Sequence, residues 1–368
     1  MFATKALEEA DRIATICNAC RYCEGLCAVF PAIETKRAFV DADLTYFANL
    51  CHACGACYQD CQFSPPHEFN VNLPRVLAEV RADSYKQYAW PRALGPIFDR
   101  NGLWISLLTA LSVAAFILSF VAFADPAALF ATGSEVGAFY RLMPHAAMAA
   151  LFGAVFLYAI IAMSLGFGAF WRDTGAARDI PGPSLWRAIR DAGELRYLGG
   201  GGDGCRNTDD VSPDRRRIYH HLTFYGFLLC FAATVVATGY HYVWGRLAPY
   251  AWYEPPVVLG TIGGIGLLFG TLGLIAAKWQ RALIMEDQTR RGMDYAFTLM
   301  LFLTALTGLL LLFLRATAAM GILLALHLGV VFALFLALPY SKFVHGPFRF
   351  GALLRYAIER QNGVTIVE

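Results

Sequence analysis

Cysteine spacing constrains this chain more than any other feature of its sequence. The 368 residues include ten cysteines, and eight of them lie within the first 61 residues. These eight form two runs with the same spacing, C-x2-C-x2-C-x3-C, and the second run starts 34 residues after the first. The first run is Cys17, Cys20, Cys23 and Cys27, and the second is Cys51, Cys54, Cys57 and Cys61.

The spacing indicates iron-sulfur clusters. It is the run found in bacterial ferredoxins, whereas a structural zinc site usually takes two ligands from one C-x2-C pair and two from a distant pair. In two-cluster ferredoxins the fourth cysteine of each run ligates the other cluster. We therefore predict two [4Fe-4S] clusters, one held by Cys17, Cys20, Cys23 and Cys61 and the other by Cys51, Cys54, Cys57 and Cys27.

One detail departs from the ferredoxin pattern. A proline normally follows the fourth cysteine directly, but here Pro31 and Pro65 lie four residues beyond it. We expect this difference to change the local turn and not the ligands.

Residues 1–100 are less apolar than the rest and are predicted to form a separate head. Apolar and charged residues follow the spacing of short amphipathic helices in Ala6–Arg12 and in Pro74–Asp83. The segment Met1 to Lys5 lacks the apolar core and cleavage site of a signal peptide. We therefore expect the head in the cytoplasm, where thiols stay reduced and a disulfide framework is disfavoured.

The remaining residues, 101–368, have the composition of a membrane protein. In the whole chain 57% of residues are hydrophobic and 16% are charged, which excludes disorder, and the net charge of +2 does not suit a nucleic-acid-binding protein. A helix needs about 20 apolar residues to cross a bilayer. Six stretches meet this length and predict a six-helix bundle: Leu103–Phe123, His145–Phe170, His221–Tyr242, Val257–Ala277, Tyr295–Leu314 and Ala318–Leu338.

Positive charge predicts the orientation of these helices. Of the 30 Lys and Arg residues, 27 lie in the head, in segments 171–219 and 278–294, or in the tail. The loops on the other side contain only Arg141, Arg246 and Arg315. By the positive-inside rule, both termini should be cytoplasmic in a protein of the bacterial inner membrane.

Two segments outside the predicted spans are interpreted more simply. The cytoplasmic loop 171–219 contains a glycine-rich stretch, Gly199–Gly204, that is neither a Walker A motif nor a dinucleotide fingerprint, so we expect a flexible loop that packs against the head or a partner. Cys205 and Cys230 have no cysteine neighbours at ligand spacing. The tail 345–368 has the pattern of an amphipathic helix on the inner surface.

Histidines in the apolar half predict b-type haem. His327 and His345 are 18 residues apart, which is five turns of one helix, and His220 and His241 are 21 apart, rotated by about 60°. Because the two helices run in opposite directions, His220 and His345 would meet at the inner level and His241 and His327 at the outer level. Each pair could supply the two axial ligands of one haem.

Two alternatives remain open in this pairing. His221 could replace His220 if the helix bulges locally, and His145, at the start of the second span, could replace His241 as the partner of His327. Pro339 lies between His327 and His345, so their common face depends on a continuous helix.

These features together resemble the tricarballylate (citrate) utilisation protein B family over essentially the whole chain. The resemblance includes the two cysteine runs, the six spans and the segments Gly199–Cys205 and Arg215–His221. The segment from His327 to His345 is also similar to the last haem-binding helix of the nitrate reductase gamma subunit. The third span differs from that subunit because Phe231 stands where a second ligand is expected.

The resemblance implies a membrane electron carrier. Its donor would be a soluble FAD-dependent tricarballylate dehydrogenase, which converts tricarballylate to cis-aconitate, and its acceptor would be the quinone pool. The chain itself has no dinucleotide fingerprint and no identifiable substrate site, so the organic oxidation should belong to another protein. The competing hypotheses are a haem-free Fe-S sensor or cluster scaffold and a transport protein.

Overall fold

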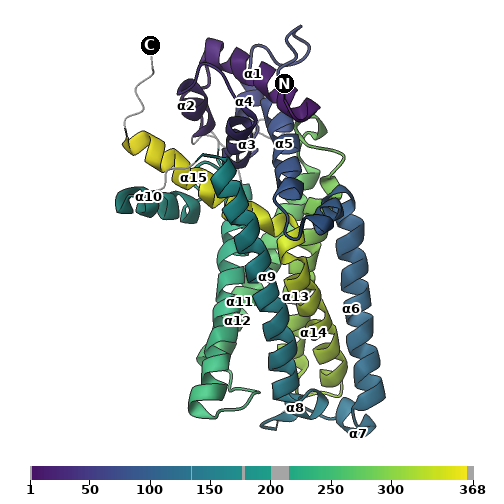
Figure 1. Cartoon of the computed structure of the whole chain (residues 1–368). Helices are drawn as coiled ribbons and strands as arrows, with labels where there is room; N and C mark the ends of the chain where they lie inside the picture. Colours follow the sequence, from purple (N-terminus) through teal and green to yellow (C-terminus); the bar gives the residue numbers. More distant parts are fainter. Residues whose placement is uncertain (1, 134, 176–178, 200–214, 363–368) are drawn as a thin grey trace.

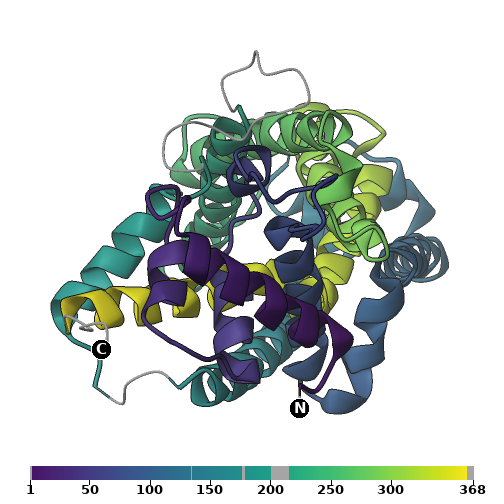
Figure 2. The same cartoon turned by 90° about the horizontal axis from the view of Figure 1, so that it is seen from above.

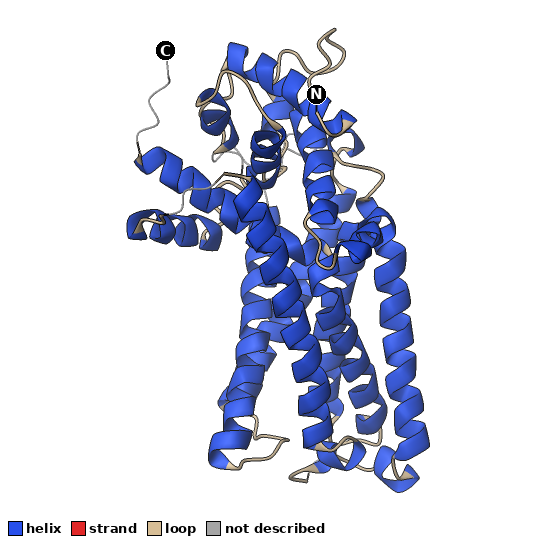
Figure 3. Ribbon diagram, viewed as in Figure 1, coloured by secondary structure: helices blue, strands red, loops and turns tan. Residues whose placement is uncertain are grey.

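The computed structural model describes residues 2–133, 135–175, 179–199 and 215–362, and within these ranges the regular structure is entirely helical (Figure 3). The predicted all-α fold is confirmed. A head of short helices stands at one end of a bundle of long helices, and the N-terminal helix and the last helix lie at this same end (Figure 1).

Five helices build the head. Thr4 caps the first by accepting a hydrogen bond from the backbone N–H of Leu7 at 3.2 Å, and Asn72 caps the fifth in the same way through Arg75 at 3.3 Å. Both segments with amphipathic spacing lie within helices. The five are α1 (Lys5–Cys20), α2 (Val29–Glu34), α3 (Asp41–Leu50), α4 (Ala56–Gln59) and α5 (Leu73–Gln87).

Six of the described helices are long and apolar enough to cross a membrane, so the chain is a multi-pass membrane protein. Each one overlaps a predicted stretch and extends at most five residues beyond it at either end. The six are α6 (Asn101–Phe123), α9 (His145–Asp173), α11 (Arg216–Trp244), α12 (Pro255–Trp279), α13 (Arg291–Leu314) and α14 (Met320–Ala337).

Glycines bring α11 and α12 into close contact. A Cβ atom on Gly226 would lie 2.6 Å from the backbone nitrogen of Leu267, and one on Gly270 would lie 2.6 Å from the backbone nitrogen of Thr223. Such contacts require glycine, because any side chain would push the two backbones apart. Close approach of small residues is a common way for helices to associate in lipid, where apolar side chains alone provide little driving force.

Short elements connect the long helices. A 3₁₀ helix, η1, leads from the head into α6, and α10 lies within the predicted cytoplasmic loop. The glycine-rich stretch after Gly199 and Cys205 lie outside the described residues. The connecting elements are η1 (Arg92–Arg100), α7 (Pro126–Leu129), α8 (Ala138–Leu142), α10 (Gly182–Gly193) and η3 (Leu283–Met285).

The chain breaks after α14, and this corrects one prediction. His327 and His345 do not share one helix, because α14 ends at Ala337 and two 3₁₀ turns, η4 (Leu338–Tyr340) and η5 (Lys342–Val344), precede the next helix. Pro339 cannot donate to the α-helical ladder, and Ser341 is extended (φ −130°, ψ −177°). The five-turn spacing therefore does not set the relation between the two histidines.

The last helix, α15 (His345–Gln361), runs beneath the head (Figure 2). Phe348 and residues 351–358 are buried, with α3, α9 and α10 packed against the helix. Arg355 joins it to the head through Asp43 at 3.2 Å and lies 4.0 Å from the centre of the Tyr46 ring. This helix is therefore an internal element between head and bundle.

Candidate functional site

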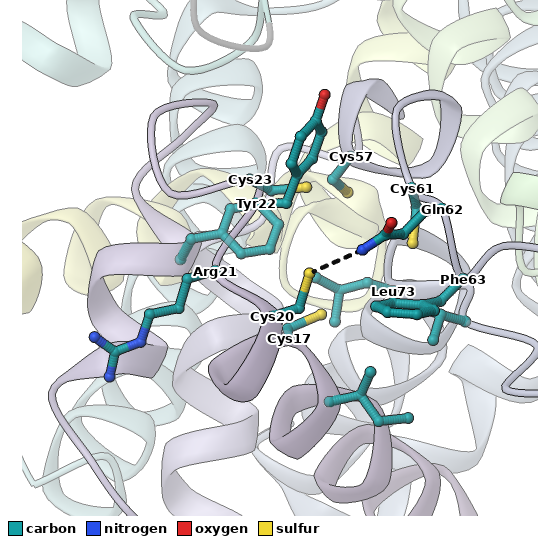
Figure 4. Close-up of a pocket in the computed structure, with 13 residues that line it drawn as sticks. Cys17, Cys20, Arg21, Tyr22, Cys23, Cys57, Cys61, Gln62, Phe63 and Leu73 are labelled. Atoms are coloured by element: carbon teal, nitrogen blue, oxygen red, sulfur yellow. Dashed lines mark hydrogen bonds between the residues drawn. The ribbon is translucent and has the colours of Figure 1, made fainter.

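The first candidate site is a cavity in the head that both cysteine runs line (Figure 4). Cys17, Cys20 and Cys23 of the first run face it together with Cys61 and Cys57 of the second. The structure thus brings Cys61, the fourth cysteine of the second run, close to the first three cysteines of the first run.

Local backbone geometry positions these cysteines. Cys17 and Cys20 lie in the last turn of α1, and Arg21 ends that helix in the left-handed region, with φ of 56°. Gln62 follows Cys61 and donates its side-chain amide to the Cys20 sulfur at 3.8 Å. The first run therefore provides sulfur atoms to this cavity, and the residue after the second run provides a hydrogen-bond donor to one of them.

The second cavity lies between α2, α4 and the start of α5 and repeats the arrangement with the two cysteine runs exchanged. Cys51, Cys54 and Cys57 line it together with Cys27 of the first run. Cys51 caps α3, and its sulfur accepts the backbone N–H of Ala53 at 3.3 Å. Cys57 lines both cavities, so the two sites share a wall.

The sulfurs that line the two cavities are buried and lie close to one another, which changes their acidity. Among the described residues no three His, Cys, Asp or Glu side chains are placed to hold one metal ion. Burial and neighbouring thiols raise the pKa of Cys17 to about 12 and that of Cys23 to about 11. Cysteine binds metals as the thiolate, so a metal group held by Cys17 and Cys23 would have to displace their protons and supply the positive charge that stabilises the thiolates.

Four arginines hold the loop that begins the second run, and we call them the arginine quartet. Their guanidinium groups donate to backbone carbonyls between Ala48 and Ala53 at 2.5 to 3.4 Å. The carbonyl of Cys51 accepts two of these bonds, at 2.7 and 2.8 Å, and that of Ala53 accepts two more, at 3.0 and 2.5 Å. The quartet consists of Arg81 on α5, Arg216 on α11, Arg281 after α12 and Arg349 on α15.

Two histidines meet directly below this loop. The ring centres of His220 on α11 and His345 on α15 are 6.1 Å apart, with their planes at 81°. His345 donates Nδ1–H to the carbonyl of Lys342 at 2.5 Å, which leaves its Nε2 lone pair available. The Nδ1 atom of His220 is buried and has no hydrogen-bond partner among the described residues. An imidazole nitrogen lies about 2 Å from a bound metal, so two axial rings on one iron have centres about 6 Å apart.

Two further histidines near this level are already engaged. His221 directs Nε2 at the carbonyl of Gly193 at 3.2 Å, on the side of α11 away from His345. His52 is buried beside the second cavity and donates Nδ1–H to the Leu50 carbonyl at 2.9 Å. Burial and the nearby Arg349 lower the pKa of His52 well below its usual value, so its ring is neutral.

At the other end of the bundle the structure brings His241 to His145. Their rings stack with centres 3.4 Å apart and planes at 13°, and Tyr140 packs against both. Within the described ranges, Nδ1 of His241 is buried and has no hydrogen-bond partner. His327 is instead paired through Nδ1 with the Thr307 hydroxyl at 3.0 Å, and it makes no ring contact with another histidine in the described part of the chain.

Comparison with known proteins identifies the family. The model described as "Citrate utilization protein B" matches residues 98–365, and its "Fer4-like domain" matches residues 10–90. The chain belongs to the citrate utilization protein B family. It is 47% identical over 366 residues to Citrate utilization protein B of Escherichia coli, covering 98% of this chain and 94% of that protein. The predicted family is confirmed, and no solved structure matches the chain.

Membership of the citrate utilization protein B family fits the arrangement of the head. The Fer4-like domain contains all eight clustered cysteines, which indicates an iron-sulfur domain. The arginine quartet was not identified from the sequence, because its members come from four distant segments. The run Arg215-Arg216-Arg217 before His220 was the one local signal for it.

Proposed function

We propose that this protein carries electrons from a soluble flavoprotein to the membrane quinone pool. The observation that supports the proposal best is the junction between head and bundle. Arg216 lies one helical turn before His220, Arg349 lies one turn after His345, and both arginines bind the loop of the second cysteine cavity. A turn is about 5.4 Å, so this cavity adjoins the histidine pair.

Two [4Fe-4S] clusters are the groups that fit the head. We assign one to Cys17, Cys20, Cys23 and Cys61 and the other to Cys51, Cys54, Cys57 and Cys27, because these sets line the two cavities. Such clusters pass single electrons when bound. The amides of Ala53 and Gln62 donate to cysteine sulfurs and would stabilise the added negative charge.

A b-type haem fits the inner histidine pair. The 6.1 Å separation of His220 and His345 equals the spacing that two axial imidazoles need, and the Lys342 carbonyl orients His345 for ligation. The engaged Nε2 of His221 favours His220 as the ligand on α11.

The outer histidines provide a second haem site centred on His241. Its buried, unpartnered Nδ1 indicates a missing ligand or hydrogen bond. The stacked ring of His145 is the nearest axial candidate, although 3.4 Å is too short to enclose an iron and the rings would have to separate by about 3 Å. His327 is the competing candidate, since its bond to Thr307 leaves Nε2 available.

The donor and the cellular setting follow from the family resemblance and the charge distribution. We propose an FAD-dependent tricarballylate dehydrogenase as the donor, because the resemblance to the tricarballylate utilisation family implies it and the head offers two cluster sites that could receive its electrons. We propose the bacterial inner membrane as the location, with the head and both termini cytoplasmic.

Purified full-length protein tests the proposal directly. We expect about eight irons per chain from the two clusters, and a dithionite-reduced minus oxidised spectrum with b-type haem bands. A soluble quinone such as decylubiquinone should then reoxidise the haem. Iron without haem bands would favour the sensor or scaffold hypothesis, and haem that quinone leaves reduced would contradict the carrier function.

A further inference from the structure

The two cysteine cavities lie in different electrostatic surroundings. The arginine quartet gathers four guanidinium groups around the loop Ala48–Ala53 of the second cavity. Arg81 is 5% exposed, and neither Arg81 nor Arg349 forms an ion pair with a described residue. Glu286 lies 3.9 Å from Arg281, but it is shared with Arg291 at 3.4 Å. Arg81 and Arg349, which both donate to the Cys51 carbonyl, therefore add positive charge beside the second cavity.

The first cavity has no comparable excess. Arg21 lines it, but this side chain is exposed and donates to the Asn18 carbonyl at 3.1 Å. Asp60 lies close enough to Cys23 to act on its thiol electrostatically. Tyr22, which also lines this cavity, is 72% exposed, so water screens the charges there.

Charge around a cluster changes its reduction potential. Reduction adds one negative charge to a centre that already holds four thiolates, and nearby cations stabilise the reduced form more than the oxidised form. Hydrogen bonds to the backbone fix the quartet in place, and burial limits the screening of its charge by water. The same charges in the exposed first cavity would have a smaller effect.

We propose that the arginine quartet makes the membrane-proximal cluster the stronger electron acceptor of the two. This inference rests on the proposed function. One electron leaves the reduced cluster of the first cavity and arrives at the oxidised cluster of the second, and no bond or proton is exchanged. The quartet residues act as positioning and tuning groups, since they touch the backbone of the loop and not the reacting atoms.

Redox titration of the two clusters, followed by electron paramagnetic resonance, tests the inference. Arg281 is the residue to change first, because it donates to the Ala53 carbonyl at 2.5 Å and lies between α12 and η3, where a substitution disturbs no helix. In R281Q we expect the cluster with the higher potential in the wild type to become at least tenfold harder to reduce, which is about 59 mV for one electron. The other cluster should keep its potential.

Matched variants separate charge from geometry. R281K retains the charge, so the equilibrium constant for reduction of each cluster should stay within twofold of the wild-type value. R349Q removes a different arginine of the quartet and should repeat the effect of R281Q. R141Q removes one arginine of α8, a helix at the end of the bundle away from the head (Figure 1), and should change neither cluster. Iron content near the wild-type value would show that each variant has assembled.

The outcomes test the role of the arginine quartet separately from the proposed electron-carrier function. Equal shifts in R281Q and R281K, a shift shared by both clusters, or no shift in R281Q and R349Q would overturn the role of the quartet. A wild-type protein without two clusters would instead refute the proposed function itself.

Discussion

At the scale of single residues, hydrogen bonding separates histidines that sequence spacing could not. His220 and His221 are adjacent, and a small change in helix phase would exchange their directions. The structure shows His221 bound to the Gly193 carbonyl, whereas His220 faces His345 with an unsatisfied nitrogen. The partner carbonyl comes from α10, a helix that the sequence interpretation had treated as part of a flexible loop.

This distinction leads to a matched prediction for the inner haem. His345→Ala removes one of the two proposed ligands and should abolish one b-type haem, measured as a halved pyridine haemochrome yield per protein. His221→Ala removes the histidine next to His220 on α11 and should retain the full haem yield.

Two variants distinguish between His145 and His327 as the second ligand of the outer haem. If His145 is the second ligand of the outer haem, His145→Ala should lose that haem while His327→Ala keeps it, and the reverse result would assign His327. Retention of full haem in His345→Ala and in both outer variants would contradict haem ligation by these residues altogether.

At the scale of elements, the sequence predicted most of what the bundle contains and little of how it packs. Long apolar runs determine the six spans because a helix satisfies all its backbone hydrogen bonds within one segment, which lipid requires. The predicted start of the third span at His221 missed the turn from Arg216, since its arginines are polar while its backbone continues the helix. The break at Pro339 was visible in the sequence, but its consequence for His345 required the coordinates.

Packing between α11 and α12 yields an element-scale prediction. Gly270→Ala would place a Cβ 2.6 Å from the Thr223 backbone nitrogen, so the helices must separate, and we expect a loss of about 1–3 kcal/mol in stability. Gly260→Ala, on the same helix, meets nothing closer than the Ala233 Cβ at 3.7 Å and should be tolerated. Thermal unfolding in detergent, followed by tryptophan fluorescence, compares the two. Equal midpoints would show that the glycine contact does not limit stability.

At the scale of the whole molecule, the head and the bundle form a joint that no single segment encodes. Arg290 bonds Asp83 at 2.5 Å, Arg355 bonds Asp43 at 3.2 Å, and the arginine quartet binds the loop of the second cavity. The arginines that predict the orientation by the positive-inside rule therefore also bind the head to the bundle. Sequence counting found these arginines but assigned them only to orientation, because their partners are mostly backbone carbonyls far away in the chain.

The arginines that bind the head also predict, by the positive-inside rule, that the head lies in the cytoplasm and that the loop between α11 and α12 lies on the opposite side of the membrane. The far loop between α11 and α12 contains Tyr253, which is 84% exposed, whereas Arg75 is an exposed residue of the head. A membrane-impermeant maleimide added to intact cells should therefore label Tyr253→Cys, and it should label Arg75→Cys only after lysis. The unmodified chain should stay unlabelled in intact cells, because its clustered cysteines would all lie inside. Labelling of Arg75→Cys in intact cells, with Tyr253→Cys protected, would reverse the topology and place the cysteine sites outside the cytoplasm.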